Sequence, residues 1–218
     1  MKESKMKKGS SRADAAEHED STDIQDYLFF YMPDTIHGEF CQLFPSTFTV
    51  DKTHISSLIG HTIDNNTDNT NTGTSASDSI TFTCAEQFMM CCKAMRFHDH
   101  TTAQLILASP SPKEHKRLGK LTTNFTAESW DEVKSAVVLA GSLAKFRQNE
   151  KLRGKLMGTG ERVLVEAASR DRVWGIGYTE KHALRFKKHW GENRLGRTLM
   201  EARETLRREE REKEESFV

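Results

Sequence analysis

From position 84 onward, apolar residues recur at spacings of three and four, which is the pattern of a helix with one face in a core. The first stripe runs through Ala85, Phe88, Met89, Cys92 and Met95. Three further stripes each predict a later helix: Trp130, Val133, Val137, Gly141 and Ala144; Leu152 and Leu156; and Leu195, Leu199, Ala202 and Leu206.

Two four-residue signals indicate where helices begin. Ser111-Pro112-Lys113-Glu114 places Ser at the N-cap, Pro at the first helical position and Glu three residues after the cap. Ser129-Trp130-Asp131-Glu132 repeats the Ser and Glu spacing. We therefore expect helices that start directly after Ser111 and Ser129.

Strand signals are fewer. Val163–Glu166 is β-branched and apolar and predicts a strand. The Phe- and Thr-rich segment 38–50 predicts a short extended region, and Tyr27–Tyr31 is the first segment able to join a core. The expected fold is compact, multi-helical and mainly α, with minor β-strand content.

Polar segments divide the chain. Between residues 61 and 79, 15 of 19 residues are Thr, Asn, Asp or Ser, too polar to offset their ordering entropy, so we expect a flexible insertion. Residues 1–23 read as a disordered charged tail and residues 207–218 as a charged carboxy-terminal tail, either a solvated helical end or a frayed segment. A single domain is expected over residues 24–206.

Composition agrees with that division. Hydrophobic residues make up 36% of the chain, against roughly 45–50% (a count that includes Gly) in an average globular protein. Lys plus Arg and Asp plus Glu number 32 each, so the formal net charge is zero. This balance argues against a sequence-independent DNA coat or a polybasic membrane anchor, although a local basic patch such as 113–120 or 145–149 remains open.

The compartment is expected to be intracellular, cytoplasmic or nuclear. The amino-terminal region lacks the apolar run of about 7–15 residues of a signal peptide, and nowhere do about 18 apolar residues run together, so we expect no membrane contact. The four cysteines form no Cys-x-x-Cys pair and are expected to be buried, reduced thiols: Cys41, Cys84, Cys91 and Cys92.

Glu86 and Lys93 are the first candidates for chemistry. Seven helical residues return to within roughly 20° of one direction, so both side chains leave the same face about two turns apart. Met90 lies on that face, beside the apolar stripe, so the helix is expected to lie inside the protein. Buried charges are costly unless paired or used. Either an intrahelical ion pair or a functional pair fits this spacing.

A second candidate follows the predicted strand. Glu166 ends that strand, and Asp171-Arg172-Val173-Trp174-Gly175-Ile176-Gly177 adds a carboxylate, an aromatic plane and two glycines. Glycine lets a backbone approach a ligand closely, and Trp can stack on a base. The segment reads either as a ligand loop or as a turn with a half-buried Trp.

Metal and cofactor signals are weak. His98-Asp99-His100 are adjacent residues that cannot all point at one ion from a regular helix, and His115 is distant in sequence. The two glycines of 175–177 lack the third glycine and the preceding strand of a dinucleotide fingerprint. We expect neither a metal nor a cofactor.

Six segments taken in order resemble the NADAR family, named for its link to NAD and ADP-ribose metabolism. The resemblance runs from about Phe40 to Leu206, interrupted by the polar insertion. Any one block is unspecific, whereas six in order are specific: Thr83–Met90 with Lys93-Ala94, Ala144–Asn149, Leu156–Gly160, Leu164–Ala167, Asp171–Gly177 and Gly191–Met200.

This resemblance implies a compact helical N-glycosidase that needs no metal. By motif position, Glu86, Lys93 and Asp171 would be catalytic. Family members are associated with removing ADP-ribose from guanine in nucleic acid, and some with hydrolysing ribosylamino-pyrimidine phosphates of riboflavin biosynthesis. The substrate pocket would be formed by these residues: Phe40, Gln42, Phe44, Trp174, Gly175, Gly177 and Asn193.

The chain departs from the family at one place. Where the family shows Phe-Ser-Asn-Phe, this sequence has Phe40-Cys41-Gln42-Leu43-Phe44. The amide is retained one carbon further out on Gln42, but the Ser hydroxyl is lost. Contacts from this segment are therefore the least transferable.

The implied residues suit glycoside chemistry. Glu86 would stabilise the cationic sugar or activate water, and Asp171 would orient the ribose or supply a second carboxyl group. Lys93, with a lowered pKa, would exchange onto a ring-opened sugar as a Schiff base. We expect removal of ADP-ribose from modified guanine, with DNA as the first choice. The alternatives are hydrolysis of the ribosylamino-pyrimidine phosphate and a non-catalytic ADP-ribose reader.

Overall fold

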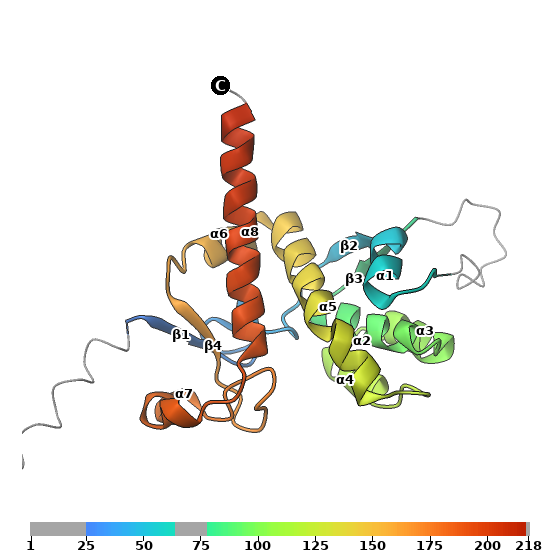
Figure 1. Ribbon diagram of the computed structural model, residues 1–218, viewed down its shortest axis with the longest axis horizontal. Coiled ribbons are helices and arrows are strands. Elements are labelled where there is room, and N and C mark those ends of the chain that lie inside the picture. Colours follow the sequence, from blue (N-terminus) through green and yellow to red (C-terminus); the bar gives the residue numbers. More distant parts are fainter. Residues whose placement is uncertain (1–24, 64–77, 217–218) are drawn as a thin grey trace, which may run out of the picture.

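The computed structural model describes residues 25–63 and 78–216 (Figure 1). Helix α2 (Ala85–Arg96) lies among α1 (Lys52–Ile59), α3 (His100–Ala108), α4 (Pro112–Gly119) and α5 (Ala127–Gln148) and contacts each of them. The mainly α fold expected from the sequence is therefore confirmed.

Helix α2 is buried on nearly all sides. Phe88, Cys91 and Cys92 are fully buried, and even Gln87 is only 1% exposed. Gln87 is accommodated because its Oε1 accepts from the backbone N–H of Thr83 at 2.7 Å and its Nε2 donates to the carbonyl of Ile106 at 3.0 Å. The helix therefore carries polar side chains into the interior. Others of its polar side chains line the cavity described below.

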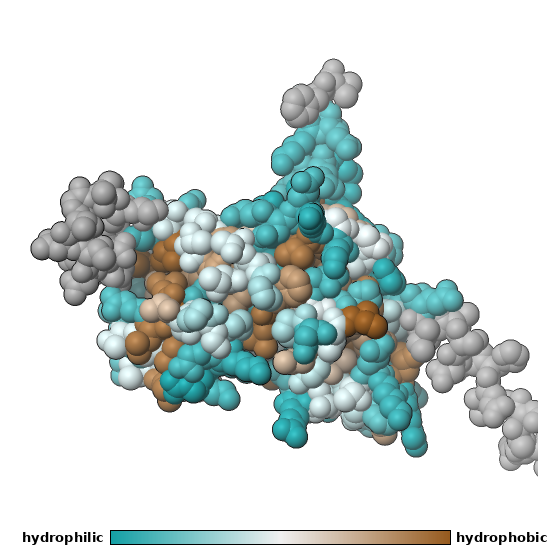
Figure 2. Space-filling view, turned by 180° about the vertical axis from the view of Figure 1, so that it is seen from behind, coloured by the Kyte–Doolittle hydropathy of each residue, from teal (hydrophilic) through white to brown (hydrophobic). Residues whose placement is uncertain are grey.

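The second half of the chain packs two long helices together. Helix α8 (Arg194–Ser216) crosses α5 and also contacts α6 (Glu150–Met157). Its last turns project from the body of the protein (Figure 1), and Figure 2 shows hydrophilic side chains along this projection. Arg147 pairs with Glu209, and Arg153 pairs with Glu210 at 2.7 Å, so the charged segment 207–216 continues the helix.

Two small sheets complete the described fold. Strand β1 (Tyr27–Phe30) pairs in parallel with β4 (Val163–Glu166), with Phe30 opposite Glu166. Strand β2 (Phe48–Asp51) pairs antiparallel with β3 (Ser79–Phe82). The strand predicted at 163–166 is confirmed, and its pairing brings the segment after β1 beside the carboxyl end of β4.

Several sequence-based expectations need correction. The long helix starts at Ala127, not after Ser129, because Thr126 is the N-cap and its side chain accepts from the Ser129 N–H. The start after Ser111 is confirmed, without a side-chain cap bond. The segment 38–50 is extended only at β2, because its first residues form the short 3₁₀ helix η1 (Gly38–Phe40).

Other elements gave no clear sequence signal. The apolar pattern did not indicate α1 or α3, and it left β3 unassigned. Helix α7 (Glu180–Ala183) and the 3₁₀ helix η3 (Leu184–His189) are short and were also missed. The expected tail 1–23 and most of the expected insertion 61–79 lie outside the described residues.

The cysteines agree with the expectation. Cys41, Cys84, Cys91 and Cys92 are free and buried. Across residues 25–63 and 78–216, every helix is too short or too polar to span a membrane.

The contact between α2 and α5 gives a stability test. A Cβ on Gly141 would lie 2.6 Å from the ring of the fully buried Phe88. Gly141→Ala should therefore lower the free energy of unfolding by about 1–3 kcal/mol, measured by urea denaturation. In α6, a Cβ on Gly154 meets nothing within 4 Å, so Gly154→Ala should raise it by about 0.5–1 kcal/mol. Equal effects of the two changes would contradict the close packing.

Candidate active site

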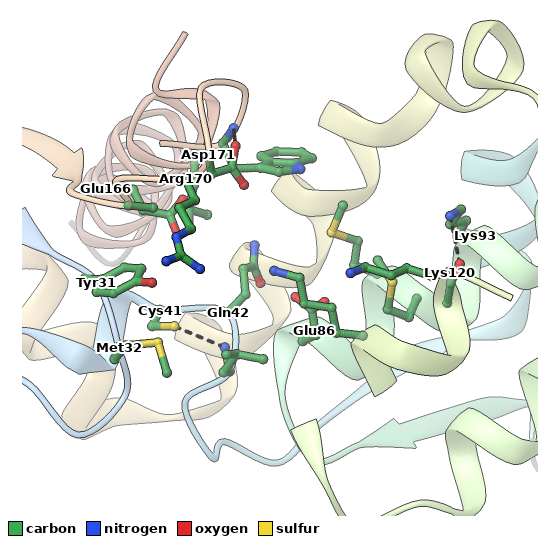
Figure 3. A pocket seen from close by; sticks show the side chains of 18 of the residues that line it. Tyr31, Met32, Cys41, Gln42, Glu86, Lys93, Lys120, Glu166, Arg170 and Asp171 are labelled. Carbon is green, nitrogen blue, oxygen red and sulfur yellow. Dashed lines mark hydrogen bonds between the residues drawn. The ribbon is translucent and has the colours of Figure 1, made fainter. Parts of the chain in front are cut away.

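A cavity of about 400 Å³ lies between helices α2 and α4 and the loop after β4. Its walls come from α2, α4, the start of α5, the loop 41–43, the residues after β1 and the loop after β4. Figure 3 shows Glu166, Arg170 and Asp171 at one side of the cavity, Glu86 at the other and Gln42 between them.

Glu86 lies in the first turn of α2, where its N–H donates to the carbonyl of Gln42 at 3.0 Å. The residue is 7% exposed and lines the cavity. Burial raises the pKa of Glu86 above its ordinary value, the charge of Lys116 lowers it, and Asp171 raises it further. A carboxyl group whose pKa is raised in this way can act as an acid or as a base in catalysis.

Glu166 supplies a second carboxyl group to the cavity. Its backbone N–H donates to Oδ1 of Asn193 at 3.0 Å, and its carbonyl accepts from the N–H of Ile176 at 3.0 Å. Burial raises the pKa of Glu166 to about 8, with Asp171 adding to the shift and Lys116 opposing it. Oε2 of Glu166 is buried and has no hydrogen-bond partner among residues 25–63 and 78–216.

The loop after β4 is held by Asp171. Its Oδ1 accepts from the N–H groups of Val173 at 2.9 Å and Trp174 at 2.8 Å. Asp171 and Trp174 both line the cavity. The carboxylate therefore fixes the turn that presents the indole to the cavity.

Lys93 lines the cavity but turns away from Glu86 (Figure 3). Its Nζ donates to the carbonyl of Gly119 at 2.8 Å and lies 4.0 Å from the centre of the Phe125 ring. Burial lowers the pKa of Lys93 below its ordinary value. These contacts replace the intrahelical ion pair that the spacing also allowed.

A buried lysine fixes the loop 39–43. Lys145, from α5, donates from Nζ to the carbonyls of Glu39 at 2.7 Å and Cys41 at 3.2 Å. Gln42 and Cys41 line the cavity as a result. Burial lowers the pKa of Lys145 to about 8 and raises that of the Cys41 thiol to about 11.

The other residues expected in the pocket lie behind its walls. Phe40 packs in the core against Phe30 and Phe146, and the Phe44 ring lies 5.5 Å from Nζ of Lys145. Neither is among the residues that line the cavity.

Gly175, Gly177 and Asn193 also act on the backbone rather than on the cavity surface. A Cβ on Gly175 would lie 2.8 Å from the carbonyl of Glu166, and Gly177 has a φ of +78°. Asn193 donates from Nδ2 to the carbonyl of Leu164 at 2.9 Å while its Oδ1 holds the N–H of Glu166. These three residues therefore position the end of β4 and the loop that follows it.

Cationic side chains that the sequence did not assign to the site line the cavity: Lys116 from α4, Lys120 directly after α4, and Arg170 from the loop after β4. The basic cluster 113–120 was visible in the sequence as a possible phosphate contact. Tyr31 and Trp130 gave no signal that could have placed them here. Glu166 had one, because it ends a predicted strand before the Asp171 loop.

The histidines around position 98 have other contacts. The His98 ring stacks on that of His61 with centres 4.1 Å apart. Asp99 accepts from the N–H groups of Thr102 at 2.9 Å and Thr123 at 2.8 Å. Within the described ranges, no group of three or more His, Cys, Asp or Glu residues is placed to hold a metal ion.

The arrangement combines acid–base groups with anion-binding groups. Two carboxyl groups with raised pKa values face a cavity that also presents three lysines, an arginine and two tryptophans. Paired carboxyl groups can protonate a leaving group and stabilise or attack a sugar cation. Cations and indoles can hold phosphates and a flat base.

Comparisons with known proteins point in one direction. Residues 29–207 match the family model described as the NADAR domain. Among curated proteins, the chain is similar to N-glycosidase R617 of Acanthamoeba polyphaga mimivirus, with 38% identity over 125 residues, 56% of this chain and 74% of that protein. It is also similar to N-glycosidase YbiA of Escherichia coli (strain K12), with 33% identity over 129 residues, 59% and 73% of the two chains.

A third relative and a solved structure agree with these two. N-glycosidase Npun_R5314 of Nostoc punctiforme is 32% identical over 122 residues, covering 56% of this chain and 72% of its own. The NMR structure of E. coli YbiA superposes with a TM-score of 0.61 at 26% identity, over 86% of this chain and 89% of that one.

Lys145 gives a test of how the site is held. Lys145→Met removes the donors to Glu39 and Cys41, so the free energy of unfolding at pH 7 should fall by about 1–3 kcal/mol. Lys155→Met removes only the ion pair at 3.2 Å between the exposed Lys155 and the mostly buried Glu39, and it should cost less, about 1 kcal/mol or below. Urea denaturation measures both.

The same pair of variants tests the pKa of Lys145. Because the folded protein releases this proton at about pH 8 and the unfolded chain near pH 10.5, the contribution of Lys145 to stability is lowest below pH 8 and rises between these values. The stability difference between wild type and Lys145→Met should therefore widen as the pH rises from about 8 to about 10. A constant difference would contradict a buried lysine of low pKa.

Proposed function

The chain belongs to the NADAR family, and from this premise we propose that it removes ADP-ribose from modified guanine bases in nucleic acid, DNA being the first choice. Relatives from a virus, a cyanobacterium and a bacterium are named N-glycosidases. The chain is accordingly a hydrolase of N-glycosidic bonds, and the proposal concerns which bond it cleaves.

One observation carries the proposal: the buried carboxyl group of Glu86 faces a cavity that is also lined by cationic side chains and two indoles. Hydrolysis of an N-glycosidic bond passes through a sugar with oxocarbenium character, which a carboxylate stabilises. The same carboxylate is placed to activate the attacking water.

The cationic side chains support a phosphorylated substrate. Lys116, Lys120 and Arg170 reach one cavity in a protein whose formal net charge is zero. Broad binding along a duplex would favour a basic domain. Concentrated positive charge at one cavity suits a single modified nucleotide, whose own pyrophosphate supplies the anion, and Trp174 offers a plane for its base.

Asp171 and Lys93 complete the proposed machinery. Asp171 keeps one oxygen on the turn at Val173 and Trp174 and uses the other to orient the ribose. Lys93 acts when the sugar is attached through an exocyclic amine, because such an aminal opens to an imine. The lysine amine then adds to that imine, the base leaves as its free amine, and water releases the sugar from Lys93.

Two other functions make different predictions. Hydrolysis of a ribosylamino-pyrimidine phosphate would need the same carboxyl groups and a smaller anion. An ADP-ribose reader would bind without turnover. We therefore propose incubating the protein separately with a guanine-ADP-ribosylated oligonucleotide and with the ribosylamino-pyrimidine phosphate, and following base release by mass spectrometry. Turnover of the second substrate alone, or binding without turnover, would overturn the proposed substrate.

Glu86 is the residue on which catalysis depends most directly. Glu86→Gln preserves the shape of a nearly fully buried side chain and removes its proton chemistry, so kcat/KM should fall by about 10²- to 10⁴-fold. Affinity for ADP-ribose, measured by calorimetry, should change little. The exposed Glu201 provides the matched control, and Glu201→Gln should retain full activity. Near-normal turnover by Glu86→Gln would exclude this assignment.

The Schiff base is tested by trapping. Borohydride added during turnover should leave a covalent sugar adduct on the protein, and peptide mass spectrometry should place it on Lys93. The low pKa of Lys93 favours the neutral amine that this step requires. Lys93→Ala should give no adduct, whereas Lys120→Ala, which removes another lysine of the same cavity, should still give one. Turnover without any adduct in the wild type would leave only direct hydrolysis.

A further inference from the structure

Glu166 has a feature that the proposed machinery does not use. Its side chain lines the cavity from the end of β4, and its Oε2 is buried without a hydrogen-bond partner among the described residues. The polar backbone groups around it are satisfied by Asn193 and Ile176. A buried carboxyl oxygen without a partner is costly when charged, so this arrangement favours the protonated acid.

The charged surroundings point the same way. From the loop after β4, Asp171 raises the pKa of Glu166, as does Glu86 from α2, and only Lys116 from α4 lowers it. Carboxyl groups that line one cavity disfavour each other's ionisation. The remaining titratable or charged groups at this cavity are Tyr31, Cys41, Lys93, Lys120 and Arg170.

The two glutamates differ in how they are compensated. For Glu86, the largest influence after burial is the favourable charge of Lys116. For Glu166, the largest influence after burial is the repulsion of Asp171. Oδ1 of Asp171 accepts from two backbone N–H groups, so this side chain is engaged in holding the turn. These differences favour Glu166 as the group that keeps its proton and Glu86 as the group that acts as a carboxylate.

We propose that Glu166 is the general acid of this site, the group that protonates the nitrogen of the leaving base, an assignment that rests on the N-glycosidase function proposed above. It sits across the cavity from Glu86 (Figure 3), so the two carboxyl groups reach a bound substrate from different sides. The role of second carboxyl group that sequence reasoning offered to Asp171 passes to Glu166.

The step balances without any further reactant. The bond between C1′ of the ribose and the base nitrogen breaks, its electron pair goes to the nitrogen, and that nitrogen takes the proton of the Glu166 carboxyl. Glu86 takes a proton from the water whose oxygen bonds to C1′. One water is consumed, and transfer of a proton from Glu86 to Glu166 through solvent restores both groups. On the Lys93 route the departing amine needs the same proton.

The kinetic test is the pH profile of Glu166→Gln, assayed on whichever of the two substrates above the wild type hydrolyses. A general acid must be protonated, so wild-type kcat/KM should fall as the pH rises through the pKa of Glu166, at about 8. Glu166→Gln should lower kcat/KM by about 10²- to 10³-fold and abolish this alkaline decline, with affinity for ADP-ribose retained and Glu201→Gln unaffected.

Two results would overturn the proposal. One is a Glu166→Gln variant within a few-fold of wild-type activity. The other is a weak variant that keeps the alkaline decline, because the decline would then belong to another group, such as Lys145 with its pKa of about 8. A purely structural role for Glu166 would give this second result.

A substrate-independent measurement separates failure of this inference from failure of the proposed function. Infrared difference spectra at pH 7 should show the carbonyl band of a protonated carboxyl group in wild type and in Glu86→Gln, and no such band in Glu166→Gln. A spectrum that Glu166→Gln leaves unchanged would refute the assignment even in an active enzyme. If neither substrate is hydrolysed while the band behaves as expected, the proposed function fails and the proton on Glu166 stands.

Discussion

The burial of α2 on nearly every side is the constraint on which the rest of the structure depends. Four helices pack around it, so each of its polar groups must find a partner or be used. Gln87 finds backbone partners at both ends of its amide, and Lys93 finds the carbonyl of Gly119. Glu86 instead lines the cavity, and the same burial raises its pKa. The packing of one helix thus places the carboxyl group that we propose to be catalytic.

The opposite wall of the cavity is held in a different way, because side chains there form hydrogen bonds with backbone groups. Lys145 holds the carbonyls of Glu39 and Cys41 and so fixes the loop that carries Gln42. Asn193 bridges Leu164 and Glu166, and Asp171 closes the turn before Trp174. Lys145, Asn193 and Asp171 each lie in one of the segments by which the sequence resembles the family. These residues hold the backbone of the site, so a residue can be needed for the shape of the site without contacting a ligand.

Sequence reasoning succeeded where a pattern has a local cause. The helix at Ala85–Arg96 and the strand at Val163–Glu166 follow from periodicity and β-branching. It failed where tertiary contacts chose between local options. Thr126 and Ser129 are both good N-caps, and the structure uses Thr126 because Ser129 instead accepts from Nε of Arg96 at 3.1 Å. Helices α1 and α3 are short and sit beside β-branched and polar residues, so their apolar faces could not be distinguished from loop residues.

The sequence by itself determined the class of the fold, the family and the types of side chain available for chemistry. Periodicity, motif order and side-chain chemistry are all properties of the chain. Only the tertiary structure decided which of those side chains share a cavity. The parallel pairing of β1 with β4 and the packing of α2 against α4 bring Glu86, Lys116 and Glu166 together across eighty residues of sequence. The pKa values of Glu86 and Glu166 depend on burial and on the charges nearby, and neither can be read from the sequence alone.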